Sequence, residues 1–145
     1  MKRSAIAQLT AWKTSVNRKP LVIRGARQVG KTWLMKEFGK MEFKNFVYIN
    51  FDSNPDMANL FEGSLQIPRL ISGLQIYCGQ KITPETLLIF DEVQELRHAG
   101  TEKYSAASLL SSGEKRLLIS TSASRSSSEA KVMASYSACI VSQRS

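Results

Sequence analysis

The stretch RGARQVGKTWL, residues 24–34, decides the fold of this chain. Its core fits the pattern G-x-x-x-x-G-K-S/T, in which a glycine-rich turn leads into a helix. The first and last glycines permit backbone angles that other residues resist, so that successive N–H groups can point inward at phosphate oxygens. The sequence therefore predicts a phosphate-binding loop that consists of Gly25, Ala26, Arg27, Gln28, Val29, Gly30, Lys31 and Thr32.

Two side chains at the end of this loop bring charge and metal-binding chemistry. We expect Lys31 to neutralise the β- and γ-phosphates of a nucleotide, and the Thr32 hydroxyl to ligate Mg²⁺. A helix that begins here also directs the positive end of its dipole at the same anion. Arg27 and Gln28 lie inside the loop, but their side chains are weaker candidates because backbone amides do most of the phosphate binding.

The segments around the loop have the order that a phosphate site requires. Residues 21–23, LVI, suit a buried strand of a parallel sheet, and residues 32–38 continue as a helix. Upstream, apolar residues at helical spacing predict an amphipathic helix over residues 3–14. This order of strand, loop and helix favours a working phosphate loop over a chance glycine turn with an exposed lysine.

Strands and helices continue to alternate after the loop. Residues 46–51 are rich in β-branched and aromatic residues, as strands are, and residues 67–77 place apolar residues on one helical face. Residues 56–61 resemble one or two helical turns, and residues 87–90, LLIF, form an apolar strand. The alternation predicts an α/β fold, a three-layer sandwich of the P-loop NTPase type with a mainly parallel sheet.

The strand at residues 87–90 is followed by two acids, Asp91 and Glu92. In open α/β sheets ligands bind outside the carboxyl ends of strands, and both the loop and this acidic pair fall there. We expect Asp91 to orient Mg²⁺ together with Thr32, and Glu92 to polarise an attacking water as general base. The alternative is an acidic strand terminus that faces solvent. The chain has no Asn-Lys-x-Asp guanine motif, so ATP is expected rather than GTP.

With these motifs the chain resembles the bacterial and archaeal AAA-type P-loop ATPases whose members carry a C-terminal domain of unknown function. The segments that carry the resemblance are KPLVIRGARQVGKTWLMKEF, VYINFD, LFEG and LLIFDEVQE, and the match covers about residues 1–95. The resemblance implies ATP and Mg²⁺ as cofactors and ATP binding with hydrolysis. It also implies a homo-oligomer, or a following C-terminal domain that is missing here, as partner.

The sequence changes character after about residue 104. Residues 105–145 contain fourteen serines, against five in the first 104 residues, and one further strand is expected at 116–119. We therefore expect residues 1–104 to form a P-loop ATPase core and residues 105–145 to form a serine-rich, weakly ordered tail. Because the family pattern fades here, we also expect a sheet that is incomplete at its C-terminal side. Our hypothesis for the origin of the tail is a frameshift or a truncation.

Length and composition limit the class of protein. A chain of 145 residues with 43% hydrophobic and 22% charged residues is typical of one soluble domain. It has neither an apolar run of roughly 18 residues nor a signal peptide, so no membrane partner and a cytoplasmic location are expected. Cys78 and Cys139 lie far apart without a histidine cluster, which argues against a metal site or a disulfide framework.

The net charge of +8 is concentrated in residues 1–45, which hold eleven Lys or Arg against two Glu. Such a basic region attracts nucleic acid or the phosphates of nucleotides, and several of these charges belong to the loop itself. Three functions remain open. The chain is a Mg²⁺-dependent ATPase, a non-catalytic nucleotide-binding fragment of a longer ATPase or, with less support, a basic nucleic-acid-binding module.

Overall fold

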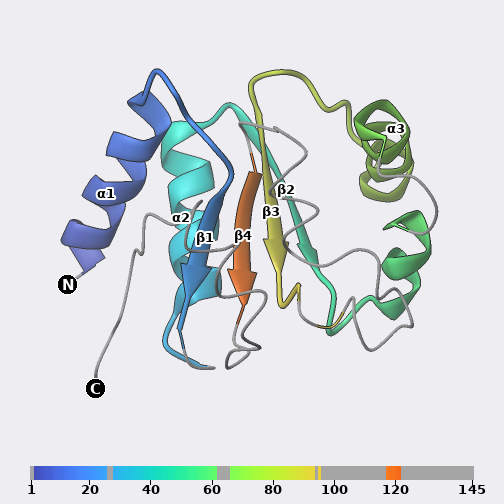
Figure 1. The fold of residues 1–145 in the computed structure, drawn as a ribbon, viewed down its shortest axis with the longest axis horizontal. Coiled ribbons are helices and arrows are strands. Elements are labelled where there is room, and N and C mark those ends of the chain that lie inside the picture. The colour runs from blue at the N-terminus through green and yellow to red at the C-terminus, as the bar shows by residue number, and fades with distance from the viewer. Residues whose placement is uncertain (1, 26–27, 62–65, 94, 96–116, 122–145) are drawn as a thin grey trace.

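The computed structural model describes residues 2–25, 28–61, 66–93, 95 and 117–121 (Figure 1). The elements follow in the order α1 (Lys2–Thr14), β1 (Leu21–Arg24), α2 (Lys31–Glu42), β2 (Asn45–Asn50), the 3₁₀ helix η1 (Pro55–Phe61), α3 (Ile67–Cys78), β3 (Thr86–Asp91) and β4 (Leu117–Thr121). Each helix and strand expected from the sequence is present, and the bounds differ by a few residues.

The four described strands form one parallel sheet in the order β1-β4-β3-β2, and their arrows all point the same way in Figure 1. The last strand in the sequence, β4, lies between β1 and β3 and pairs Ile119 with both Val22 and Phe90. The predicted α/β fold with a parallel sheet is confirmed. The division of the chain at residue 104 stays a prediction.

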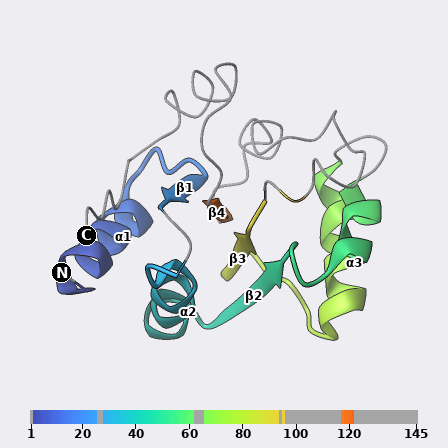
Figure 2. The same ribbon diagram turned by 90° about the horizontal axis from the view of Figure 1, so that it is seen from below.

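Helices cover both faces of the sheet, which makes three layers (Figure 2). α1 and α2 pack on one face, and η1 and α3 cover the other. Successive side chains of a strand point to opposite faces. In β3, Leu87 and Ile89 lie in the core beside α1 and α2, whereas Leu88 and Phe90 lie in the core beside η1 and α3. The same alternation places Asp91, two residues after Ile89, on the α2 face.

Three phenylalanine rings hold η1 against the sheet. Phe51, Phe61 and Phe90 meet edge to face, with ring centroids 5.3, 5.6 and 5.7 Å apart. Such aromatic pairs each stabilise a fold by about 0.5–1.5 kcal/mol beyond the burial of their area. The trio therefore fixes the segment that follows β2 at the carboxyl edge of the sheet.

Helix α3 differs from expectation at one apolar position. Leu70 and Leu74 are buried, as the helical spacing predicted, but Tyr77 is 50% exposed. Its hydroxyl donates a hydrogen bond to Asn54 Oδ1 at 2.6 Å, and the helix ends one residue later. Tyr77 therefore has a polar partner near the surface that the apolar pattern could not indicate.

Within the described part of the chain, none of the helices combines the length and the apolar character needed to cross a bilayer. Apart from β4, the serine-rich segment expected to be weakly ordered lies outside the described residues.

Candidate functional site

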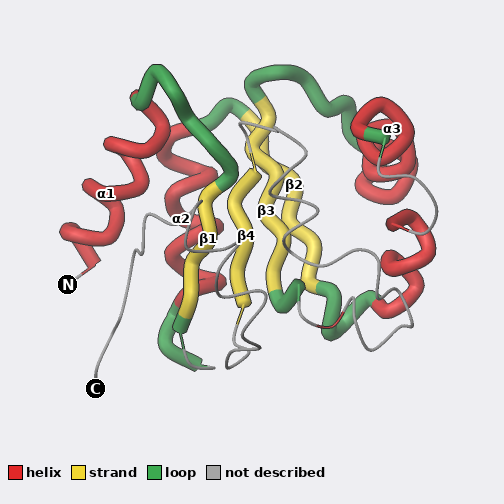
Figure 3. The backbone as a smooth tube through the Cα atoms, viewed as in Figure 1, coloured by secondary structure: helices red, strands yellow, loops and turns green. Residues whose placement is uncertain are grey.

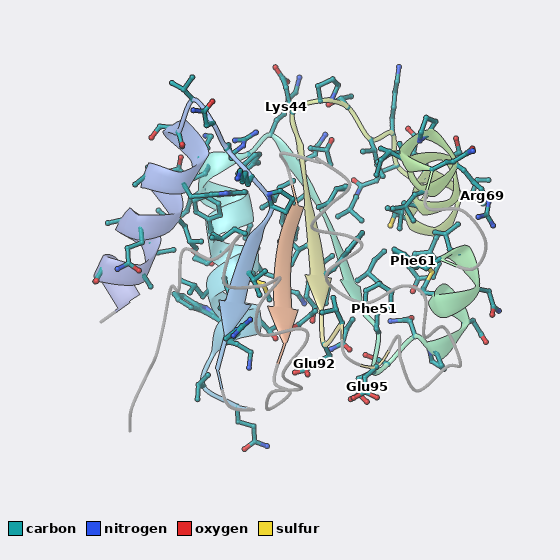
Figure 4. The ribbon with its side chains drawn as sticks, viewed as in Figure 1. Lys44, Phe51, Phe61, Arg69, Glu92 and Glu95 are labelled. Carbon is teal, nitrogen blue, oxygen red and sulfur yellow. The ribbon has the colours of Figure 1, made fainter. Side chains whose placement is uncertain are left out.

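The site residues expected from the sequence gather at one edge of the sheet. β1 leads into the glycine loop, α2 begins at Lys31, and β3 ends at Asp91. Figure 3 shows the loops that follow β2 and β3 at this end of the strands. Figure 4 shows Glu92 there as well, at the end of the sheet opposite Lys44. This carboxyl edge is where open α/β sheets bind their ligands.

The described part of the glycine loop has an unusual backbone. Gly30, at the start of α2, has a φ of 88° in the left-handed region, which glycine adopts without steric cost. Gln28 also lies there, with a φ of 64°, an uncommon value for a residue that has a Cβ. Within the described residues no side chain caps α2 at Gly30, and the start of a helix favours an anion because its first N–H groups lack partners inside the helix. Ala26 and Arg27, expected to belong to the loop, lie outside the described residues.

Gly25, at the other end of the loop, packs closely against the side chains of Val29 and Lys31. A Cβ at this position would lie 3.3 Å from Val29 Cγ2 and 3.5 Å from Lys31 Cδ. The Lys31 side chain is 6% exposed, and its Nζ donates a hydrogen bond to the Gly25 carbonyl at 2.8 Å. A buried ammonium group must be paired in this way, because an unpaired one is costly. The buried positive charge of Lys31 is therefore held against the backbone carbonyl at the other end of the same loop.

The predicted metal-binding pair, Thr32 and Asp91, comes together in the structure. Thr32 Oγ1 donates a hydrogen bond of 2.6 Å to Asp91 Oδ2. Asp91 is 1% exposed, and a buried carboxylate must be hydrogen-bonded to avoid a large desolvation cost. This contact joins the first turn of α2 to the end of β3.

Tyr48 is a third member of this group that the sequence did not indicate. Its hydroxyl donates a hydrogen bond to Asp91 Oδ2 at 2.8 Å. Burial, the hydrogen bond to Asp91 and the negative charge of Asp91, in that order of size, together raise the pKa of Tyr48 to about 12. Tyr48 therefore stays protonated, as a donor, near neutral pH. The one feature of the sequence that could have indicated Tyr48 is the alternation of side chains in β2, which places Tyr48 and Asn50 on one face of the strand.

Glu92 follows Asp91 in a strained conformation. Its φ is 54°, a left-handed value that costs a residue with a Cβ roughly 1–2 kcal/mol. The Glu92 N–H donates to Asp91 Oδ1 at 3.1 Å, and the Glu92 carbonyl accepts a hydrogen bond from Glu95 N at 3.0 Å. Strained residues of this kind cluster at functional sites, where the surrounding structure maintains them.

These side chains fit a triphosphate with a divalent cation. Lys31 and the open start of α2 suit an anion, and the oxygens of Thr32 and Asp91 are the hard donors that Mg²⁺ prefers. Arg24 precedes the loop, and its Nη2 is buried without a hydrogen-bond partner in the part of the chain that the structure describes. The described residues contain no group of three or more His, Cys, Asp or Glu that could enclose a metal alone. The donor set therefore suits a cation shared with phosphate oxygens.

The parallel sheet, the glycine loop and the buried Thr32–Asp91 contact define this chain as a P-loop domain of the nucleotide-binding class. Within that class, the family model described as "AAA domain" matches residues 17–140, and the chain belongs to this family of AAA-type P-loop ATPases. The match extends past residue 95, where the resemblance visible in the sequence ended, and it includes β4. The predicted membership of the AAA-type P-loop ATPases is confirmed, and with it nucleotide binding as the property of the domain, whereas the bacterial or archaeal origin stays a prediction.

Among solved structures, the chain is similar to that of PCH-2 from C. elegans, with a TM-score of 0.47 and 18% sequence identity. The similarity covers 94% of this chain and 37% of the PCH-2 chain, so the present chain spans little more than a third of the length of that protein. No curated protein matches the sequence.

Proposed function

We propose that this chain binds ATP together with Mg²⁺ at the carboxyl edge of its sheet and hydrolyses it. The observation that carries the proposal is the 2.6 Å hydrogen bond between Thr32 Oγ1 and Asp91 Oδ2. It unites the start of the loop helix with the acidic end of a neighbouring strand, in a chain that belongs to a family of nucleotide-binding domains. The preference for ATP rests on the sequence, which lacks a guanine-recognition motif.

Each residue has a distinct role in this proposal. The loop amides from Gly25 to Thr32 donate to phosphate oxygens, and Lys31 places its positive charge beside them. Thr32 and Asp91 would hold Mg²⁺, which supplies positive charge to the phosphate oxygens when bound. The carboxylate of Glu92 accepts the proton of the attacking water.

Assembly with another protein segment is a further part of the proposal. Membership of the AAA family supports a homo-oligomer. In phosphoryl transfer, an arginine supplied to the site accelerates hydrolysis by about 10³- to 10⁵-fold. A neighbouring copy or domain that supplies such an arginine would therefore raise the rate strongly.

Calorimetric titration with MgATP tests the binding step. We expect Lys31→Ala to weaken MgATP binding by roughly 10- to 150-fold, because a hydrogen bond to a charged group contributes about 1.5–3 kcal/mol. Lys40→Ala is the matched control, since Lys40 is an exposed lysine in the last turn of the same helix. Wild-type protein that takes up no MgATP, or equal affinities for wild type and Lys31→Ala, would contradict the proposal.

A further inference from the structure

One oxygen of the buried carboxylate has two hydroxyl donors from different elements. Asp91 Oδ2 accepts from Thr32 Oγ1, in α2, at 2.6 Å and from Tyr48 Oη, in β2, at 2.8 Å. Thr32 is the residue assigned above to the metal, and Tyr48 has no role in the proposed function. The second donor therefore needs an explanation of its own.

The Tyr48 side chain has one contact on its ring and another on its hydroxyl. Lys36 Nζ lies 3.8 Å from the ring centroid, and Asn50 Nδ2 donates to the Tyr48 hydroxyl at 3.4 Å. Lys36 lies four residues after Thr32 in α2, so both side chains are on the same helical face. In the strand pairing, Asn50 lies opposite Asp91. Helix α2 and strand β2 thus both direct the phenol toward the carboxylate.

We propose that Tyr48 is a positioning residue of the Mg²⁺–ATP site, and that its hydroxyl orients the Asp91 carboxylate for the cation. The proposal rests on the proposed function, because it assumes that Thr32 and Asp91 hold the metal. Tyr48 touches neither metal nor nucleotide in this role and acts only through Asp91. Carboxylates that ligate metals are commonly held by such outer hydrogen bonds, whose loss costs about 10- to 100-fold in metal affinity or activity.

A purely structural role for Tyr48 makes a different prediction. Tyr48 is partly buried against the core formed by α1, α2 and the strands, so it also contributes to packing. A packing residue would affect the whole site, and its loss would weaken ATP binding equally with and without Mg²⁺. A positioning residue would affect only the part of ATP binding that depends on the cation.

The test compares ATP affinity in excess Mg²⁺ with ATP affinity in EDTA, by calorimetry on the full chain. For Tyr48→Phe we expect the ratio of the two affinities to fall by about 10- to 100-fold, while the affinity in EDTA stays within about twofold of wild type. Tyr77→Phe is the matched control, because it removes a tyrosine hydroxyl in α3 that also donates a short hydrogen bond, to Asn54 at 2.6 Å. We expect this control to change neither affinity.

Two results would overturn the proposal while the proposed function stands. One is an unchanged ratio in Tyr48→Phe, and the other is an equal fall of both affinities, which includes the case of a variant that does not fold. Failure of the proposed function has a different signature, since wild-type protein itself would then bind no ATP or show no effect of Mg²⁺. That result would overturn the positioning role as well.

Discussion

At the scale of single residues, Glu92 combines backbone strain with a position beside the buried Asp91. The left-handed conformation, with a φ of 54°, is maintained although a residue with a Cβ resists it. The hydrogen bonds of its backbone to Asp91 and Glu95 hold the turn in place. The turn therefore presents the acid at the carboxyl edge of the sheet, where the proposed hydrolysis would need its general base.

Glu92→Gln should separate hydrolysis from binding. The amide has nearly the shape of the carboxylate but cannot accept a proton, so phosphate release at saturating MgATP should fall by about 10²- to 10⁴-fold. MgATP affinity should stay within about threefold of wild type, because Lys31, Thr32 and Asp91 are unchanged. Glu95→Gln serves as control, since Glu95 lies three residues further on at the same end of the sheet (Figure 4). Equal, near-background rates in wild type and Glu92→Gln would leave a nucleotide-binding domain without turnover.

At the scale of elements, the close approach of α2 to β2 depends on a glycine inside the helix. A Cβ on Gly39 would lie 2.9 Å from Phe46 Cγ and 3.0 Å from Phe46 Cδ1. Phe46 is partly buried against the core beside α2, and the close atoms lie at the root of its ring, so the contact is relieved only if the whole ring shifts. In α3, a Cβ on Gly73 would lie 2.1 Å from Leu60 Cδ1, 3.1 Å from Cδ2 and 3.2 Å from Cγ, all of them atoms of one flexible, partly buried side chain.

The two glycines should therefore respond in opposite ways to alanine. Alanine is favoured over glycine inside a helix by about 1 kcal/mol, whereas overpacking costs about 1–3 kcal/mol. Gly39→Ala should lower the free energy of unfolding by up to about 2 kcal/mol, because the strained Phe46 contact outweighs the helix propensity. Gly73→Ala should be neutral or stabilising by up to about 1 kcal/mol, since Leu60 can change rotamer. Urea denaturation measures both, and a Gly39→Ala variant as stable as wild type would contradict this account.

At the scale of the whole molecule, β4, the last described strand in the sequence, lies inside the sheet. β4 pairs with β1 on one side and β3 on the other, so the glycine loop and the acidic strand end are joined through it. The register places Ile119 opposite both Val22 and Phe90, and all three residues lie far apart in the sequence. Such pairing between distant segments can form only after most of the chain has been brought together.

A proline in β4 should therefore destroy the fold. Ile119→Pro removes a backbone N–H, and with it a ladder hydrogen bond, from a central strand, where proline is essentially not found, and a domain is stabilised by only roughly 5–15 kcal/mol. We expect the variant to lose near-UV circular dichroism and a cooperative thermal transition. Ile119→Val keeps the N–H and a β-branched side chain and should unfold within a few degrees of wild type. A cooperative transition in Ile119→Pro at the temperature of the valine variant would show that β4 is not central.

Much of the site followed from the sequence because its elements are local. Gly30 signals a left-handed turn and Lys31 a charge at the start of a helix, and both are properties of a few neighbouring residues. Thr32 and Asp91 could be predicted as partners because the carboxyl ends of parallel strands share one edge. Tyr48 could not, since its contact with Asp91 depends on β2 and β3 being neighbours in a particular register.

The amino-acid pattern was thus sufficient for the helices and strands, the α/β class and the phosphate loop, because the periods of 3.6 and 2 and the glycine turns arise within short segments. The order of the strands arises from pairing between distant segments, so only the folded chain shows that β4 lies between β1 and β3. The same holds for the hydroxyl of Tyr48 beside Asp91 and for the burial of the Lys31 ammonium group. Hydrogen bonds across a sheet and the exclusion of water depend on neighbours that are remote in the sequence, so a pattern within a short segment cannot predict them.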